Sequence, residues 1–237
     1  MKTKIRSLTH PWNLSPKDAK TLQIQLSRRV VRESEINIEN VTSVTGIDTH
    51  YQGDLSLAVA VTIRLPELET VECSTAVKRA TFPYVSGLLA FREGPTILAA
   101  LKNLTTAPEL LMLDGHGIAH PRRCGLASHI GLLMDRPSIG CAKTLLSGYY
   151  NEPDTERGCS SPLKDGDEII GAVVRSRRGV KPLFVSIGHR INLKDSISIV
   201  LRCCSRYRVP ETMRQADQLA RGELKHLIRC KNLQENR

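Results

Sequence analysis

Two aspartates directly follow strand-like segments and could together hold a metal ion. Asp48 follows the β-branched run 41–47, and Asp114 follows the wholly apolar run 110–113. Ligand sites of open α/β sheets lie beyond the carboxyl ends of the strands. Two carboxylates on adjacent strands repel each other unless a cation lies between them, and their oxygen atoms favour Mg²⁺ or Mn²⁺. The alternative is that each aspartate only caps a turn.

Two further acids extend this candidate metal site. Glu93 stands just before a predicted helix that begins at Pro95, and Asp217 lies on an otherwise apolar face of the last predicted helix. An acid on such a face is costly to bury unless it is paired or bound to a cation. The alternatives are a favourable charge at a helix N-terminus for Glu93 and a salt bridge to Arg214 or Arg221 for Asp217.

The segment 114–122, which reads DGHGIAHPR, is the densest group of candidate side chains. His116, His120 and Arg122 offer hydrogen-bond donors that could contact phosphate. Lys143 follows another short strand-like run and would bring a positive charge to the same sheet edge, where it could hold a phosphate or a leaving group. The alternatives are ordinary turn residues and a solvated lysine.

An aromatic turn over residues 82–87, which reads FPYVSG, has no evident helix or strand role. Pro83 stiffens the turn, so Tyr84 could be inserted between bases. The chain holds only one Trp, five Tyr and three Phe, and two aromatic residues in one turn favour that role. The alternative is an aromatic side chain that caps the core.

The elements that must position these residues can be predicted from periodicity and turn signals. Ser15 and Pro16 predict a helix start within a helical lead-in over residues 1–40. Three strand-like runs with short connections then predict an antiparallel meander: 41–47, 57–65 and 70–79.

The rest of the chain alternates helical and strand patterns. The predicted helices are 95–104, 126–133, 193–204 and 210–228, the predicted strands are 110–113, 138–142, 168–174 and 182–187, and 149–167 is predicted as an exposed loop. This order predicts an α/β protein with a mixed β-sheet flanked by helices, as a single domain over residues 1–237.

Composition narrows the class of protein. With 41% hydrophobic residues in 237, the chain can form a full core, which excludes wholesale disorder. Its longest apolar run is 57–61, far below the roughly 20 residues that span a bilayer, and its first thirty residues contain no secretory h-region. The seven cysteines form no CxxC pair and no zinc spacing. We therefore expect a cytoplasmic protein with reduced thiols, no membrane partner and no readable obligate protein partner, and a thiol enzyme is the weakest alternative.

The net charge of +10 is concentrated near the C-terminus. Residues 175–237 hold 15 basic and 5 acidic residues, whereas residues 1–174 hold 19 of each. A basic segment attached to a neutral body favours a polyanionic partner such as nucleic acid. The alternative is a solvated surface.

These features together resemble the endonuclease V family of inosine-directed repair nucleases. The resemblance covers about residues 48–220, and a set of motifs this long and in this order is specific. Its motifs are GID at 46–48, PYVSGLLAFRE at 83–93, LDGHGIAHPR at 113–122, GCAK at 140–143 and GHR at 188–190.

The resemblance implies a ribonuclease H-like fold and a Mg²⁺-dependent endonuclease, with Mn²⁺ as a substitute. The implied substrate is double- or single-stranded DNA that contains deoxyinosine. The implied reaction cuts the second phosphodiester bond 3′ to the lesion and leaves a 3′-hydroxyl and a 5′-phosphate. The altered base would be flipped out of the stack, because a change of one exocyclic group cannot be inspected thoroughly inside the stack.

By position in the motifs, the resemblance also implies roles for individual residues. The metal-site acids would be Asp48, Glu93, Asp114 and Asp217, and Lys143 would be the active-site lysine. Tyr84, next to Pro83, would fill the gap left by the flipped base. The base pocket would be formed by Gly87, Leu89, Gly115 and Leu126. Further nucleic-acid contacts would come from Arg92, His116, His120 and Arg122.

The chain departs from the family pattern in three places. Ser86 replaces the second proline of the usual wedge, the segment 210–214 lacks a proline that the family has there, and Asp217 stands where some members have histidine. Two alternatives remain open: an endoribonuclease of the same family that acts on inosine in RNA, and a nucleic-acid-binding module without catalytic activity.

Overall fold

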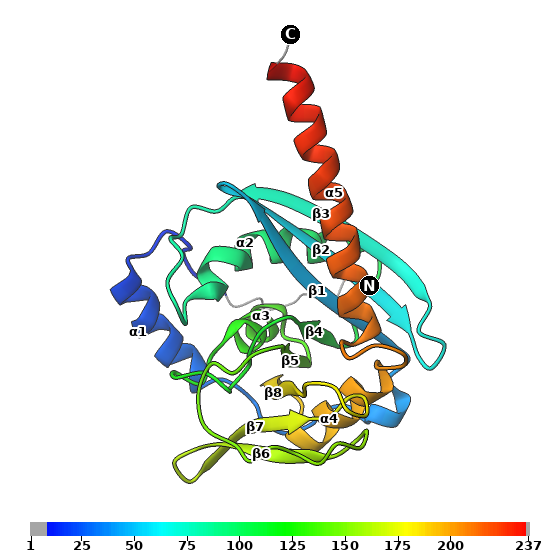
Figure 1. The fold of residues 1–237 in the computed structure, drawn as a ribbon. Helices are drawn as coiled ribbons and strands as arrows, with labels where there is room; N and C mark the ends of the chain where they lie inside the picture. The colour runs from blue at the N-terminus through cyan, green and yellow to red at the C-terminus, as the bar shows by residue number, and fades with distance from the viewer. Residues whose placement is uncertain (1–8, 236–237) are drawn as a thin grey trace.

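The computed structural model describes the backbone of residues 9–235 and side chains up to residue 223. In this part of the chain, one eight-stranded sheet is surrounded by helices (Figure 1). The elements, in chain order, are α1 (Pro16–Ser27), the 3₁₀ turn η1 (Ile38–Asn40), β1 (Ser43–Gln52), β2 (Leu55–Arg64), β3 (Thr70–Arg79), α2 (Leu89–Lys102), β4 (Leu111–Leu113), α3 (Leu126–Met134), β5 (Ser138–Ala142), β6 (Ser160–Asp165), β7 (Glu168–Val174), β8 (Leu183–His189), α4 (Leu193–Arg202) and α5 (Glu211–Glu235).

The strand order of the sheet is β3-β2-β1-β4-β5-β8-β7-β6. The first three strands form the predicted antiparallel meander, and β1, β4 and β5 are parallel. The order β3-β2-β1-β4-β5, with only β2 running against the others, is the ribonuclease H-like arrangement. The predicted α/β class, mixed sheet and single domain are thus confirmed.

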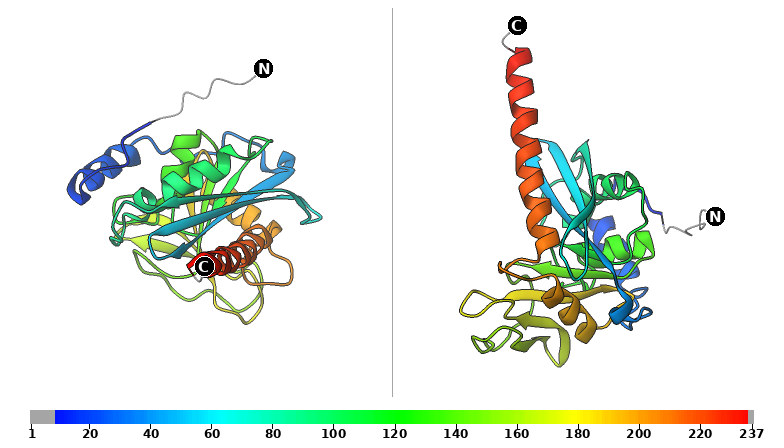
Figure 2. Two further views of the ribbon diagram at one scale, coloured as in Figure 1. Left: turned by 90° about the horizontal axis from the view of Figure 1, so that it is seen from above. Right: turned by 90° about the vertical axis from the view of Figure 1, so that its right-hand side faces the viewer.

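Helices cover both faces of this sheet (Figure 2). Helices α2 and α3 share one buried cluster with Ile47 of β1 and Leu113 of β4. Helices α4 and α5 share the opposite cluster with Val44 of β1 and Met112 of β4. Because neighbouring residues of a strand point to opposite faces, the even-numbered residues of β1 face α5 and the odd-numbered ones face α2.

The start of α5 is fixed against the middle of β1 by one threonine. The Gly46 N–H donates to Thr212 Oγ1 at 2.7 Å, and the same hydroxyl donates to the Val61 carbonyl at 2.7 Å. A Cβ at position 46 would lie 2.5 Å from Thr212 Oγ1, so only glycine allows this approach. Asp217, further along α5, is thereby brought beside Asp48, which is two residues after Gly46.

The predicted strand end at Asp48 is wrong. Strand β1 continues to Gln52 and forms a hairpin with β2 across Gly53, whose φ is 59°. Polar residues after position 48 suggested an end, but they pair with β2. The short strand β4 pairs with β1 only as far as Ile47 opposite Leu113. Asp48 is therefore the first residue beyond the parallel pair, inside a strand.

The predicted helix start at Pro95 is also wrong. Helix α2 begins at Leu89 and contains Pro95 in its interior. Burial of Phe91 in a cluster with Phe82 and Leu88 outweighs the usual penalty of an interior proline, roughly 3 kcal/mol. Glu93 consequently lies within the helix on its buried side, and the interpretation of Glu93 as a charge placed before a helix is wrong.

Several smaller expectations can be compared with the structure. The Ser15 cap is confirmed, because its side chain accepts from the Asp18 N–H. Within residues 9–40, the predicted helical lead-in is helical only in α1 and η1, and the predicted loop 149–167 contains β6. Residues 1–8 and 236–237 and the side chains of 224–235 lie outside the described part. The six cysteines whose side chains are described are free thiols. Among the described helices, none combines the length and apolar character of a membrane span.

A buried histidine connects the N-terminal segment to α3. His129 Nε2 lies 2.7 Å from His10 Nε2, and the Trp12 ring stacks on His129 at 5.6 Å between centroids. His129 is fully buried. Burial, followed by the charge that His10 can carry, lowers the pKa of His129 to about 3 from 6.5.

We predict that this histidine makes the fold sensitive to acid. A histidine kept neutral in the fold stabilises it fully above the unfolded pKa of 6.5, and that stability is lost as the pH falls from 6.5 toward 3. Between pH 7.5 and pH 5, the free energy of unfolding should therefore fall by about 2 kcal/mol more in the wild type than in His129→Gln. Urea unfolding at the two pH values measures the difference, and equal losses in both proteins would contradict the assignment.

Candidate active site

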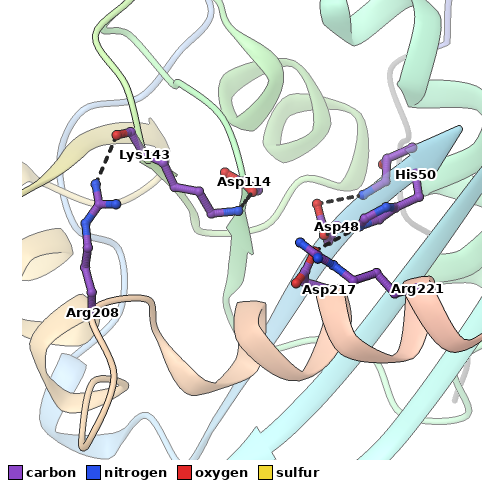
Figure 3. A network of polar contacts seen from close by, with 8 residues as sticks. Asp48, His50, Asp114, Lys143, Arg208, Asp217 and Arg221 are labelled. Carbon is purple, nitrogen blue, oxygen red and sulfur yellow. Dashed lines mark hydrogen bonds and ion pairs between the residues drawn. The ribbon is translucent and has the colours of Figure 1, made fainter.

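A histidine and two aspartates meet where β1 faces α5. His50 Nε2 lies 3.1 Å from Asp48 Oδ2 and 3.1 Å from Asp217 Oδ1 (Figure 3). One potential ligand atom from each of the three lies within 4.8 Å of the other two. Arg221 Nε also donates to Asp217 Oδ1, at 3.0 Å. The salt bridge considered as an alternative for Asp217 therefore exists, with Arg221, alongside a metal-ligand geometry.

Asp114 lies beside this group and forms a separate ion pair with Lys143. It directly follows β4, and its Oδ2 forms an ion pair with Lys143 Nζ (Figure 3). Lys143 directly follows β5, which is the neighbour of β4 in the sheet. The Arg208 guanidinium donates to the backbone carbonyls of Lys143 and Pro182, at 3.0 and 2.8 Å, and so fixes the path of the chain at the lysine.

Glu93 approaches the same sheet edge from α2. Its Oε1 accepts a hydrogen bond from the Tyr51 hydroxyl at 3.3 Å, and only 7% of the residue is exposed. The Arg92 guanidinium lies over the Tyr51 ring, 4.7 Å from its centroid, and donates to the Phe82 carbonyl at 2.6 Å. Arg92 is thus used to connect α2 with the aromatic turn.

The acids influence one another electrostatically. Burial, together with the charges of Asp48 and Asp114, raises the pKa of Glu93 to about 8. Burial, and next the Asp114 carboxylate, raise the pKa of Asp48. Burial alone would lower the pKa of Lys143, but the carboxylate of Asp114 outweighs it and raises that pKa. The acids therefore form a buried region in which negative charge is incompletely neutralised.

This donor set fits a hard divalent cation. Buried carboxylates whose ionised forms are disfavoured become ionised when a cation neutralises them. Carboxylate oxygens are the ligands that Mg²⁺ and Mn²⁺ prefer. Asp48, Asp217 and His50 are grouped closely enough for one ion, while Asp114 and Glu93 border that group.

A cavity of about 420 Å³ opens next to the acids. The four residues predicted for a base pocket all line it: Gly87, Leu89, Gly115 and Leu126. Asp114, Lys143 and His116 line the same cavity. The cavity therefore shares a wall with the charged cluster, so that a group bound in it would hold an attached phosphate close to Asp114 and Lys143.

The aromatic turn forms another wall of the cavity. Tyr84 is 78% exposed at its rim, which contradicts the alternative interpretation of a core-capping aromatic. Gly87 adopts φ 76°, a left-handed conformation that favours glycine. The Gly87 carbonyl accepts from Gln23 Nε2 at 3.1 Å, His120 Nε2 at 2.9 Å and an Arg122 nitrogen at 2.9 Å.

These contacts change the interpretation of His120 and Arg122. His120 is 2% exposed, and its Nδ1 accepts from the Arg122 N–H at 3.1 Å. Arg122 Nε donates to the Gln23 side-chain oxygen at 2.6 Å. Their polar groups hold the turn, so the geometry favours a positioning role over direct phosphate contact. His116 Nε2 is likewise 3.1 Å from the Thr144 carbonyl.

Sequence reasoning missed three residues at this site. His50 follows Asp48 by two positions, and strand alternation could have placed it on the same face. Tyr51 carries no local signal of its contact with Glu93. Gln23 is buried in α1, 99 residues before Arg122 in the chain, and no sequence pattern connects the two.

Comparison with known proteins gives a consistent result. The family model described as endonuclease V matches residues 24–218. The endonuclease V of Roseiflexus sp. strain RS-1 is 47% identical over 91% of this chain and 96% of its own length. The crystal structure of endonuclease V from Streptomyces avermitilis superposes with a TM-score of 0.88 at 42% identity, covering 93% of this chain and 98% of that one.

A more distant structure contains nucleic acid. The endonuclease V of Ciona intestinalis was crystallised with a 24-mer DNA that contains an inosine followed by a ribo-adenosine. It is 29% identical with a TM-score of 0.77, over 89% of this chain and 98% of that one. Motifs, fold and relatives agree, and the chain belongs to the endonuclease V family of phosphodiester-hydrolysing nucleases.

Proposed function

We propose that this protein recognises deoxyinosine in DNA and hydrolyses the second phosphodiester bond 3′ to it, in a reaction that depends on Mg²⁺ or Mn²⁺. The observation that carries the proposal is the wall shared by the cavity and the charged cluster, to which Asp114 and Lys143 both belong. The inosine-containing DNA bound by the Ciona intestinalis relative supports the choice of base. The bond that is cut follows from the family resemblance.

The cavity is suited to a flipped base. Its volume of about 420 Å³ falls in the usual range of small-ligand pockets. Its lining by Leu89 and Leu126 offers apolar contact to the faces of a base. Tyr84 stands exposed at the rim, where it can stack in the place of the extruded base.

The acids and Lys143 would have different roles in hydrolysis. Asp48 and Asp217, with Asp114 and Glu93 beside them, would hold the cation, which when bound neutralises developing phosphoryl charge and lowers the pKa of a water. Lys143 can exchange its ion pair with Asp114 for a contact to the substrate phosphate. Arg208 keeps the backbone of Lys143 in place during that exchange.

Two other functions make different predictions. An endoribonuclease of the same family would prefer inosine in RNA, and a binding module without catalysis would hold the substrate uncut. The complete set of acids together with Lys143 supports catalysis. The segment 114–121 resembles that of the prokaryotic, DNA-directed members of the family, which supports DNA over RNA. The ribo-adenosine in the relative's ligand makes a direct comparison of both polymers necessary.

The first prediction from the proposed function concerns activity and the metal-site acids. With Mg²⁺, the purified protein should nick a duplex with a single deoxyinosine at the second phosphodiester bond 3′ to it, directly after the nucleotide that follows the lesion, and should cut the matched RNA more slowly. Asp114→Asn should reduce nicking by at least about 100-fold, because it removes one of the carboxylates that would hold the cation at the reacting phosphate. It should still bind the DNA in EDTA.

The matched control is Asp54→Asn, an exposed aspartate paired with Arg79 at a hairpin tip, which should nick normally. Mapping of the cut on sequencing gels and a filter-binding assay measure the two properties. Undiminished nicking by Asp114→Asn would overturn the site assignment, and RNA cut faster than DNA would favour the endoribonuclease.

The second prediction concerns Tyr84. Tyr84→Ala should lower kcat/KM on duplex DNA by about 10-fold or more, because stacking on one base is worth roughly 1–3 kcal/mol. Single-stranded DNA should be affected much less, since no gap in a duplex has to be filled. Tyr84→Phe keeps the ring and should retain activity on both substrates. An equal loss on both substrates would argue against the wedge role.

The third prediction concerns Gln23. Gln23→Leu leaves Arg122 Nε without its acceptor and removes one of three donors from the Gly87 carbonyl, which should destabilise the fold by about 1–3 kcal/mol. Because the pocket turn is loosened, KM for inosine DNA should rise more than kcat falls. Gln25→Leu, on the exposed side of the same helix, is the matched control. Unchanged KM in a destabilised Gln23→Leu would limit this residue to a structural role.

A further inference from the structure

His50 is placed to do more than neutralise its neighbours. Its Nε2 is equidistant, at 3.1 Å, from carboxylate oxygens on two different elements, Asp48 on β1 and Asp217 on α5. Its side chain is 23% exposed, so the ring is partly held by the protein. As an even-numbered residue of β1, His50 faces α5 together with Asp48.

The distances themselves discriminate between two arrangements. An Nε2–H can point at only one carboxylate oxygen with good geometry, so a simple charge pair leaves one of the two contacts poor. Bonds of about 2.1 Å around an octahedral ion place neighbouring ligand atoms about 3.0 Å apart. The two separations of 3.1 Å match this value, and a cation among the three atoms would use all of them.

Neither Arg221 nor Lys143, the other charged groups near Asp48 and Asp217, can serve as the nitrogen ligand that His50 offers. Arg221 contacts Asp217 from α5, but its side chain is 67% exposed and can turn into solvent. Lys143 is paired with Asp114. Within the part of the chain that the structure describes, His50 is thus the nitrogen donor that reaches both Asp48 and Asp217.

We propose that His50 is a direct protein ligand of the cation held by Asp48 and Asp217, and that its nitrogen makes this site favour Mn²⁺ over Mg²⁺. The chemical basis is that Mg²⁺ strongly prefers oxygen ligands, whereas imidazole is a good ligand for transition metals. This inference rests on the proposed metal-dependent function. It adds a histidine ligand and a preference for Mn²⁺ over Mg²⁺, which a site made of carboxylates alone would not have.

The test uses the full chain without DNA. Metal-free protein is titrated with Mn²⁺, binding is followed by the loss of the free-ion electron paramagnetic resonance signal, and electron spin-echo envelope modulation detects nitrogen bound to the ion. Wild-type protein should show ¹⁴N modulation from one imidazole. His50→Gln should lose it and bind Mn²⁺ about 10-fold more weakly, while its Mg²⁺ affinity, measured by competition, should change less than about 3-fold.

The matched control is His10→Gln, whose ring contacts His129 and Trp12 rather than the acids; it should keep the ¹⁴N signal. Wild-type protein labelled with ¹⁵N-histidine should shift the modulation to ¹⁵N frequencies, and this keeps the test decisive if His50→Gln does not fold. Absence of nitrogen modulation in Mn²⁺-loaded wild type, its persistence in His50→Gln, or a failure of wild type to bind Mn²⁺ would overturn the proposal.

These outcomes are separate from those of the proposed function. A protein that binds Mn²⁺ through His50 but leaves inosine DNA uncut would contradict the function and retain the ligand assignment. A protein that nicks inosine DNA with Mg²⁺ but shows no nitrogen bound to Mn²⁺ would retain the function and contradict the ligand assignment.

Discussion

Mutual repulsion among buried acids is the constraint on which this site depends. Asp48 and Glu93 are each less than a tenth exposed, and the charge of Asp114 raises the pKa of both. A buried, ionised carboxylate destabilises a fold unless a positive charge lies near it. The protein provides part of this positive charge through Lys143, which pairs with Asp114, and Arg221, which pairs with Asp217. The remaining negative charge is what, in the proposed function, would attract a cation and, through it, a phosphodiester.

The register of β1 converts this electrostatic requirement into geometry. Because side chains alternate along a strand, Gly46, Asp48 and His50 all face α5, and Tyr51 faces α2 and Glu93. A slip of one residue would exchange these sets. The register is fixed by ten pairs with β2 and by Thr212, which fits only against a glycine. The same glycine that allows α5 to approach thus determines that Asp217 reaches Asp48.

The parts that the sequence could predict are those with strong local signals. The meander, β4, β5 and α3 follow from apolar runs and turn residues, and Asp114, Lys143 and Asp217 follow from motifs. The start of α2 could not be predicted, because packing of Phe91 overrides the signal of Pro95. Gln23 could not be found, because its partners are brought to it only by the fold. The sequence therefore predicts which acids and which lysine gather at the sheet edge better than the contacts that hold them there.

In the basic C-terminal part, too, the composition suggests a role that the contacts of individual residues do not simply follow. Its charge suggests a surface for phosphate, yet several of its arginines donate to backbone carbonyls inside the protein. Arg175, 6% exposed, contacts the carbonyls of Asp154 and Val180, and Arg202 contacts those of Ile38 and Val41. Because a guanidinium keeps its charge when its donors are used, such residues hold loops in place and still contribute positive potential. Arg208 combines both effects at the site, since it fixes the backbone of Lys143 and adds its positive charge near that lysine.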